Sequence, residues 1–139
     1  MDNFIWQENY SVGVDYFDNQ HKTLFRTAQS LYREIMNSKS ELVINNILND
    51  LLQYVNSHFH DEEYYMEKYG YKRLLEHKQE HKQFENKIKE LQKDYQEGKV
   101  FVAMKLLNYL QDWFFDHIVR EDQRYGPLLR DKEIRSAPE

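Results

Sequence analysis

Residues 74–95 read LLEHKQEHKQFENKIKELQKDY, and their apolar side chains recur every three or four positions. From Phe84 to Leu91 the spacing is that of one face of an amphipathic helix. Extended toward the N-terminus, the same face carries His77 and His81, where a helical bundle would normally place apolar residues. The stretch therefore predicts a long helix whose buried face becomes polar at one end.

Three other stretches show the same spacing. Helices are expected at about residues 19–38, 41–68, 72–96 and 100–121. The links between them, NSKS, YGY and QEGK, are short, and short links force consecutive helices to be antiparallel neighbours. Glycine and proline, which would interrupt helices, number only four and two. The predicted fold is all-α, an up-down-up-down antiparallel four-helix bundle.

The segments outside the bundle are short. The bundle is expected to span about residues 19–122, preceded by an irregular arm at 1–18 and followed by a tail at 126–139. The side chains expected to hold the arm against the bundle are Trp6, Tyr10 and Val12. With 139 residues and no linker or repeat, residues 1–139 are expected to form a single domain.

Composition excludes several classes of function. Because cysteine is absent, disulfides, thiolate zinc sites and iron–sulfur clusters are excluded, and nitrogen and oxygen must hold any metal. Nineteen lysines and arginines against 24 aspartates and glutamates give a net charge of −5, and the basic residues are scattered, so no nucleic-acid partner is expected. Charged residues interrupt the most apolar stretch, residues 101–118, and no secretory signal is visible. We therefore expect a cytoplasmic protein without a membrane partner.

The buried faces of all four predicted helices lead onto polar residues. Continuing each apolar series in steps of three and four gives His21, then His58 and Glu62, then His77 and His81, then His117. Five of the six histidines therefore point inward, and His60 is the exception. Burying five imidazoles and a carboxylate without partners is costly, whereas bound metal would satisfy them all.

These polar residues are also expected at one height in the bundle. Antiparallel helices rise equally on both sides of a turn, about 1.5 Å per residue, so residues equidistant from a turn lie at the same level. The pairs whose midpoints fall at the three links are His21 with His58, Glu62 with His77, and His81 with His117. All four helices thus contribute to one polar layer.

Beyond His117 two carboxylates compete for a place in this layer. Regular helical spacing leads to Arg120 or Glu121, whereas Asp122, at i+5, would be rotated by about 140°. Asp122 reaches the layer only if the helix loosens, for example in a π-bulge, and such bulges occur at functional sites. Spacing alone does not decide between Glu121 and Asp122.

The number of candidate ligands indicates two metal ions. Five imidazoles and one or two carboxylates exceed the three protein ligands of a catalytic zinc ion and the four of a structural one. Ligands rich in nitrogen and free of thiolate suit iron, copper or zinc, so spacing does not identify the metal. Residues 77–81 have the H-x-x-E-H form of one class of zinc protease, but Glu80 leaves the buried face and three other helices add ligands. The two Glu-x-x-His motifs of ferritin-like di-iron proteins are absent.

Four segments resemble the motifs of the hemerythrin family in its bacterial single-domain form. They are SVGVDYFDNQHKTLF (11–25), HFHDEEYYM (58–66), HKQEH (77–81) and WFFDHIVRED (113–122). The match runs from about Phe4 to Leu128 and preserves order and spacing. The resemblance implies two iron ions bridged by an oxo or hydroxo group that bind dioxygen reversibly, and it favours Asp122 over Glu121.

Carried over residue by residue, the resemblance implies a role for each member of the layer. One iron would be held by His77, His81 and His117. The other would be held by His21 and His58 and would keep an open position, with Glu62 and Asp122 bridging the pair. The side chains implied to wall a dry dioxygen pocket are Phe59, Trp113, Ile118 and, one turn from His21, Leu24.

The expected function is reversible dioxygen binding for storage, delivery or buffering, without enzymatic activity. One alternative is an oxygen or redox sensor that acts through a separate protein partner, whose identity the sequence does not give. Another is a di-iron redox enzyme that acts on peroxide or nitric oxide. A sensor predicts an oxygen-linked change in shape or partner binding, and an enzyme predicts turnover with an electron donor.

Overall fold

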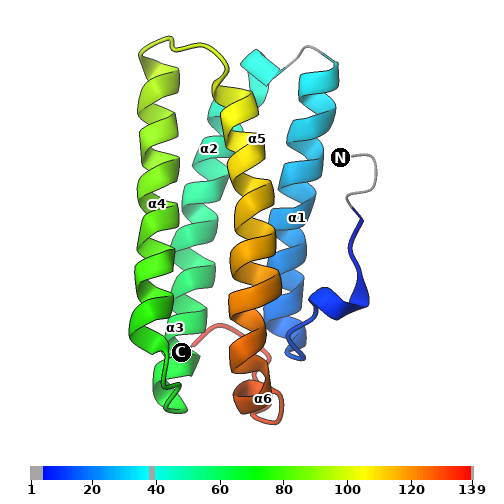
Figure 1. Cartoon of the computed structure of the whole chain (residues 1–139), viewed down its shortest axis with the longest axis vertical. Coiled ribbons are helices and arrows are strands. Elements are labelled where there is room, and N and C mark those ends of the chain that lie inside the picture. Colours follow the sequence, from blue (N-terminus) through cyan, green and yellow to red (C-terminus); the bar gives the residue numbers. More distant parts are fainter. Residues whose placement is uncertain (1–4, 38–39, 139) are drawn as a thin grey trace.

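The computed structural model describes residues 5–37 and 40–138, except the side chains of residues 40–42. The described residues form four long helical rods (Figure 1). The rods are α1 (Asp15–Met36), the continuous run of α2 (Ser40–Tyr54), η2 (Val55–Phe59) and α3 (His60–Lys68), α4 (Leu74–Gln96), and α5 (Val102–Trp113) with η3 (Phe114–Glu121). None of these helices combines the length and apolar content needed to cross a membrane.

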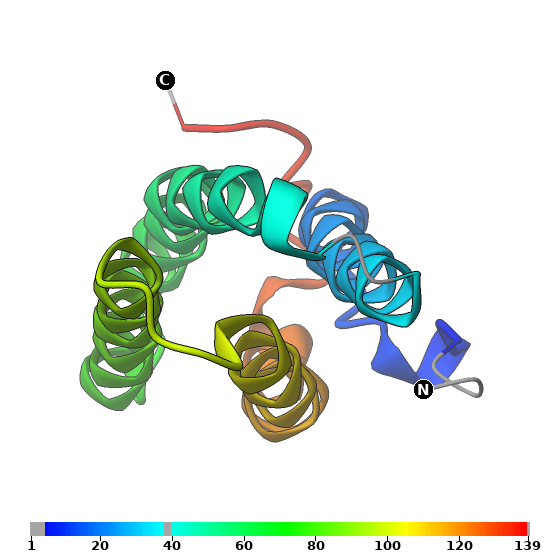
Figure 2. The same ribbon diagram turned by 90° about the horizontal axis from the view of Figure 1, so that it is seen from above.

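Consecutive rods run in opposite directions, which confirms the predicted up-down-up-down bundle. Helix α1 packs against α2 and α5, and α4 also packs against α2 and α5. Seen from above, the four rods form a ring around one interior (Figure 2). Each rod therefore turns one face toward that interior, as the amphipathic spacing requires.

The ends of the helices differ slightly from the expected ones. Helix α1 begins at Asp15 rather than at about residue 19, so the irregular arm is shorter than predicted. Helix α5 begins at Val102 rather than at about residue 100, because Gly98 (φ 74°) and Phe101 (φ 65°) adopt left-handed conformations that extend the turn. Residues 1–4 of the predicted arm and residues 38–39 of the NSKS link lie outside the described residues.

Aromatic contacts hold the N-terminal arm against the bundle. The arm contains a short 3-10 turn, η1 (Glu8–Tyr10). The Trp6 ring meets Phe25 and Phe114 edge-on, with each pair of centroids 6.0 Å apart. The Asp18 carboxylate accepts a hydrogen bond of 2.8 Å from the backbone N–H of Val12. The arm is thereby fixed along α1 and η3.

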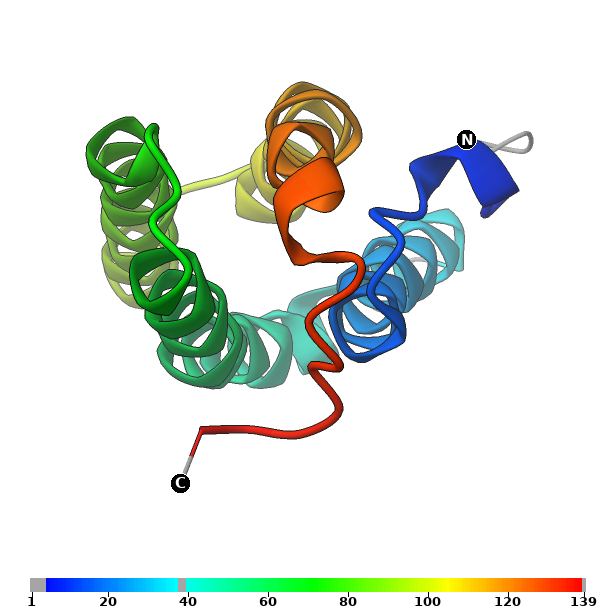
Figure 3. The ribbon, with the colours of Figure 1, turned by 90° about the horizontal axis from the view of Figure 1, so that it is seen from below.

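The C-terminal tail packs against the N-terminal arm at one end of the bundle. After η3 the chain continues through η4 (Asp122–Tyr125) and α6 (Gly126–Leu129). Leu129 and Ile134 are buried in a cluster that includes Val12 of the arm. Figure 3, a view from below, shows the tail crossing this end of the bundle. The two terminal segments therefore form a common cap.

The buried apolar residues of the described chain form a large cluster and a small one, and the polar layer lies between them. On α1, His21 stands between Phe17 of the small cluster and Leu24 of the large one. In the second rod, Glu62 likewise stands between a residue of the large cluster, Phe59, and one of the small cluster, Met66. Apolar packing thus shields the layer from above and below.

Candidate metal centre

Seven buried polar residues from all four rods meet in this layer. They are His21 (α1), His58 (η2), Glu62 (α3), His77 and His81 (α4), His117 (η3) and Asp122 (η4). Their exposed fractions are between 0 and 2%. The fold therefore brings together all seven residues that the sequence pointed to, whereas His60 is exposed on the surface.

The seven residues form two overlapping groups. In each group, one ligand atom from every member lies within 4.8 Å of the others. The larger group consists of His77, His81, His117, Glu62 and Asp122, and the smaller of His21, His58, Glu62 and Asp122. The two carboxylates belong to both groups, which is the arrangement that bridging ligands between two cations require.

A π-helical stretch decides which C-terminal carboxylate enters the layer. In η3 the i→i+5 pattern widens the helix, so His117 and Asp122, five residues apart, both face the interior. The Glu121 carboxylate lies outside the layer, 3.5 Å from the guanidinium of Arg73. The second rod is loosened in the same way at η2, which carries His58. The structure thus places Asp122, and not Glu121, in the layer.

The orientation of the ligand atoms fits bound cations. His77 Nε2 and His117 Nε2 lie 2.9 and 3.0 Å from Asp122 Oδ1, and His81 Nε2 lies 3.2 Å from Glu62 Oε1. Among the described residues, these three Nε2 atoms, Glu62 Oε1 and both Asp122 oxygens are buried without a well-aligned hydrogen bond. Buried polar atoms are rarely left unsatisfied, and cations between the nitrogens and oxygens would satisfy all six. The residues present therefore fit a two-metal centre of nitrogen and oxygen ligands.

In the absence of metal, His21 and His77 hold protons in the layer. Burial lowers the pKa of His21 and His77, but their close contacts with the Asp122 and Glu62 carboxylates outweigh it and raise the two values to about 9 and about 10. Burial would raise the pKa of Glu62 and Asp122, yet the surrounding histidines hold both values well below their usual range. Burial lowers the pKa of His58. Protons and cations thus compete for the same atoms.

Two carboxylates outside the layer hold histidines of the larger group. His81 Nδ1 lies 2.7 Å from Glu63 Oε2, and His117 Nδ1 lies 3.4 Å from Glu80 Oε1. An Nδ1–H that donates to a carboxylate leaves Nε2 free to bind a metal and makes it a stronger ligand. These contacts fix the ring orientations that point Nε2 into the layer.

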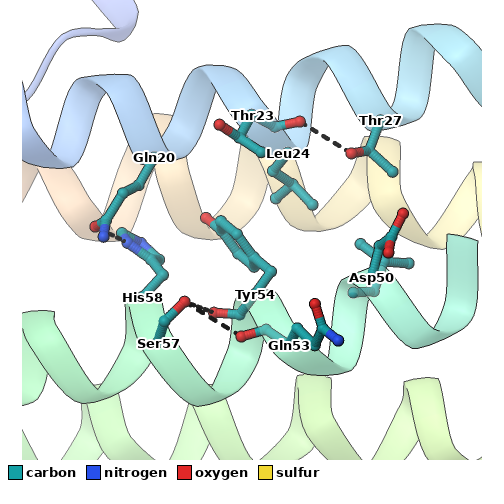
Figure 4. Close-up of a pocket in the computed structure, with 10 residues that line it drawn as sticks. Gln20, Thr23, Leu24, Thr27, Asp50, Gln53, Tyr54, Ser57 and His58 are labelled. Carbon is teal, nitrogen blue, oxygen red and sulfur yellow. Dashed lines mark hydrogen bonds between the residues drawn. The ribbon is translucent and has the colours of Figure 1, made fainter.

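In the smaller group, the partner of a histidine Nδ1 atom is a neutral side chain. His58 Nδ1 lies 2.5 Å from Gln20 Oε1 (Figure 4). The Gln20 amide N–H donates to Asp61 Oδ2 over 3.0 Å, and the Tyr16 hydroxyl donates to the same oxygen over 2.6 Å. Asp61 therefore orients Gln20 so that its carbonyl oxygen faces His58. The histidines of the larger group are thus held by carboxylates, whereas His58 of the smaller group is held by a neutral amide.

The sequence did not reveal these outer residues. They include Tyr125, whose hydroxyl donates a hydrogen bond to Glu62 Oε2. Gln20, Glu63 and Glu80 each stand directly beside a layer residue in the sequence. That adjacency is a weak signal, because every ligand has two neighbours and most of them face solvent.

Two of the predicted pocket residues cover the larger group. The Phe59 ring stacks on His81 with centroids 3.8 Å apart and an interplanar angle of 2°. The Trp113 ring stacks on His117 with centroids 4.1 Å apart and an angle of 12°. Both rings are buried. They exclude water from the three-histidine side of the layer.

The other two predicted pocket residues lie elsewhere. Leu24 lines a cavity of about 390 Å³ between α1 and the second rod, and His58 lines the same cavity. Ile118 is buried in the large hydrophobic cluster. Of the four predicted pocket residues, Leu24 thus lies beside the smaller group, where the resemblance places the open position.

Comparisons with known proteins agree with this geometry. The sequence profile of the family described as "Hemerythrin HHE cation binding domain" matches residues 12–129. The chain is 34% identical to a bacteriohemerythrin of Clostridium acetobutylicum over 131 residues, covering 88% of this chain and 98% of the relative. It is 28% identical to myohemerythrin-1 of Phascolopsis gouldii over 126 residues, covering 91% and 94%.

Solved structures give the same result. The crystal structure of a wild-type hemerythrin superposes with a TM-score of 0.81 at 31% sequence identity, covering 91% of this chain and 97% of that one. Profile, relatives and structure therefore agree along nearly the whole chain, and the residues matched by the profile, 12–129, contain the whole layer. The chain belongs to the hemerythrin family, known for reversible dioxygen binding at a non-haem di-iron site.

Proposed function

We propose that the seven buried residues of this chain hold two iron ions and that the protein uses them to bind and release dioxygen. The observation that carries the proposal is that two ligand groups share Glu62 and Asp122. A shared pair of carboxylates holds two cations at a fixed separation, which a set of separate mononuclear sites would not require. Family membership supports iron as the metal.

The two groups supply different numbers of ligands. His77, His81 and His117 with both carboxylates offer five protein ligands to one ion. The smaller group offers four, so an ion held there would keep room for an external ligand. Two iron ions joined by an oxo or hydroxo group would supply the two electrons that reversible dioxygen binding needs.

The chain's own side chains keep the centre dry and ordered. Phe59 and Trp113 stack on ligand rings and exclude water, which would promote loss of the reduced state. Glu63 holds the proton on Nδ1 of His81, and the Gln20 carbonyl oxygen accepts a hydrogen bond from the Nδ1–H of His58. Each ring is thereby kept in the tautomer that directs Nε2 toward the metal.

The test is the iron content of the purified protein, followed by visible spectra of the reduced form cycled between argon and air. We expect two irons per chain and a colour change that reverses on removal of oxygen. A single zinc ion, or iron that oxidises without a reversible intermediate, would overturn the proposal. In Asp122→Ala, which lacks one shared carboxylate, the iron content should fall below two per chain.

The biological setting is part of the same proposal. We expect storage, delivery or buffering of dioxygen by a single domain, residues 1–139, in the cytoplasm, and the cysteine-free composition fits a reducing compartment. Fractionation of cells followed by detection of the protein tests the location. Recovery with the periplasmic or membrane fraction would contradict it.

A further inference from the structure

A buried hydroxyl without a hydrogen-bond partner in the described part of the chain lies beside the smaller ligand group. The cavity of about 390 Å³ lies between α1 and the second rod, and its lining includes Leu24, Tyr54 and His58 (Figure 4). The Tyr54 hydroxyl is buried and has no hydrogen-bond partner among the described residues. A buried hydroxyl without a partner loses its hydrogen bonds to water and gains none in return.

Tyr54 is held in place by the ligand set itself. Its ring stacks on His58, with centroids 4.9 Å apart and an interplanar angle of 26°. Figure 4 shows the ring rising from α2 toward α1, so that the hydroxyl lies on the α1 side of the cavity. The ring is also in contact with the edge of Phe59, at a centroid distance of 6.0 Å. The side chain is therefore fixed, and its hydroxyl is buried beside the cavity.

The surroundings of this hydroxyl link it to the polar layer. Burial raises the pKa of Tyr54 well above its usual value, and the negative charges of Glu62 and Asp122 raise it further. The contact that joins Tyr54 to the layer is the stacking of its ring on His58. Phe59 and Trp113 cover the larger group with apolar rings, whereas the smaller group is faced by an O–H donor.

We infer that the buried Tyr54 hydroxyl recognises the small external ligand of the smaller group, donating a hydrogen bond to dioxygen or to a small anion that binds beside His58. This inference rests on the proposed function. A fixed, buried donor favours ligands that carry or develop negative charge, because hydrogen bonds to charged acceptors are the stronger ones. Tyr54 would thus be a specificity-determining residue rather than a metal ligand.

The test compares azide binding to the iron-loaded, oxidised protein and to its Tyr54→Phe variant. The variant keeps the ring that stacks on His58 and removes only the hydroxyl. We expect the dissociation constant of azide to rise roughly tenfold, which is typical for loss of one hydrogen bond to a charged group. Tyr109→Phe is the matched control, since Tyr109 of α5 packs on Phe84 of α4 and lines no part of this cavity. Its azide affinity should stay within about twofold of the parent value.

An infrared measurement gives a second readout. The azide stretching band of the parent protein should shift between H₂O and D₂O, and Tyr54→Phe should abolish the shift. Unchanged azide affinity in Tyr54→Phe, or a parent band insensitive to D₂O, would overturn the inference. If Tyr54→Phe fails to take up iron, the D₂O measurement on the parent protein decides whether the inference holds.

Iron content separates this inference from the proposed function. A parent chain with fewer than two irons would overturn both. A parent chain with two irons and reversible dioxygen binding, but with azide affinity independent of the Tyr54 hydroxyl, would overturn the role of Tyr54 alone.

Discussion

The two outer carboxylates should contribute unequally to iron affinity. Glu63 and Glu80 contact His81 and His117, which belong to the same ligand group. Substitution of either carboxylate therefore reports on the affinity for the same ion. The Glu63 contact is 2.7 Å long, which is typical of a charge-assisted hydrogen bond. The Glu80 contact, at 3.4 Å, is longer than ordinary N–H···O hydrogen bonds.

These distances set the expected magnitudes. A hydrogen bond to a charged group contributes about 1.5 to 3 kcal/mol, and the 26% exposure of the Glu63 side chain favours the lower end. Glu63→Gln should therefore weaken iron binding about tenfold, within the range known for groups that orient metal ligands. Glu80→Gln alters a contact that is already long and weak, so iron binding should weaken only about twofold.

The assay is anaerobic competition for ferrous iron between each variant and a coloured chelator. Glu85→Gln serves as the control, because Glu85 lies on the same helix and pairs with Lys82 and Lys89 rather than with a histidine. Its iron affinity should equal that of the parent. If Glu80→Gln weakened iron binding as much as Glu63→Gln, or if neither had an effect, the reasoning from distance and charge would be refuted.

Two further outcomes follow from the metal-free protein and from the cap at one end of the bundle. The folded-state pKa values of His21 and His77, about 9 and about 10, lie above the value of about 6.5 for an unfolded histidine, so their contribution to stability is complete below pH 6.5 and is lost as pH rises through 9 to 10. The melting temperature of the metal-free protein should fall between pH 6.5 and 9, and a rise over that range would contradict the pairing with Glu62 and Asp122. Separately, a Cβ at Gly126 would lie 2.7 Å from the backbone oxygen of Val12, so Gly126→Ala should lower the free energy of unfolding in urea by about 1 to 3 kcal/mol. An alanine variant as stable as the parent would show that the arm can move aside at little cost.

Much of the fold and of the metal centre could be predicted from local patterns. The spacing of Phe84, Ile88 and Leu91 indicates a helix without reference to the rest of the chain, since it depends only on the 3.6-residue period. The common height of His21 and His58 follows from equal rise on both sides of a short link. Both properties are fixed by backbone geometry, so tertiary contacts were not needed to find them.

The outer contacts were beyond such reasoning. Gln20 and His58 are 38 positions apart, and Glu80 and His117 are 37 apart, in different rods. Whether two such side chains touch depends on the rotation of each rod about its axis. The sequence period fixes that rotation only to within the width of the apolar face, which is broader than one side chain.

The sequence by itself determined the four helices, their antiparallel order and the polar layer, because helical period, rise per residue and short links are local properties. Its resemblance to a known family added the metal and favoured Asp122 over Glu121. Only the tertiary structure decided how Asp122 reaches the layer, through the π-helical turn of η3, and which side chains orient the ligand rings. It also decided that apolar rings cover the three-histidine group while Tyr54, whose hydroxyl is buried, stacks on His58. The physical reason is that these features arise where rods meet, and the packing of side chains from distant segments sets them.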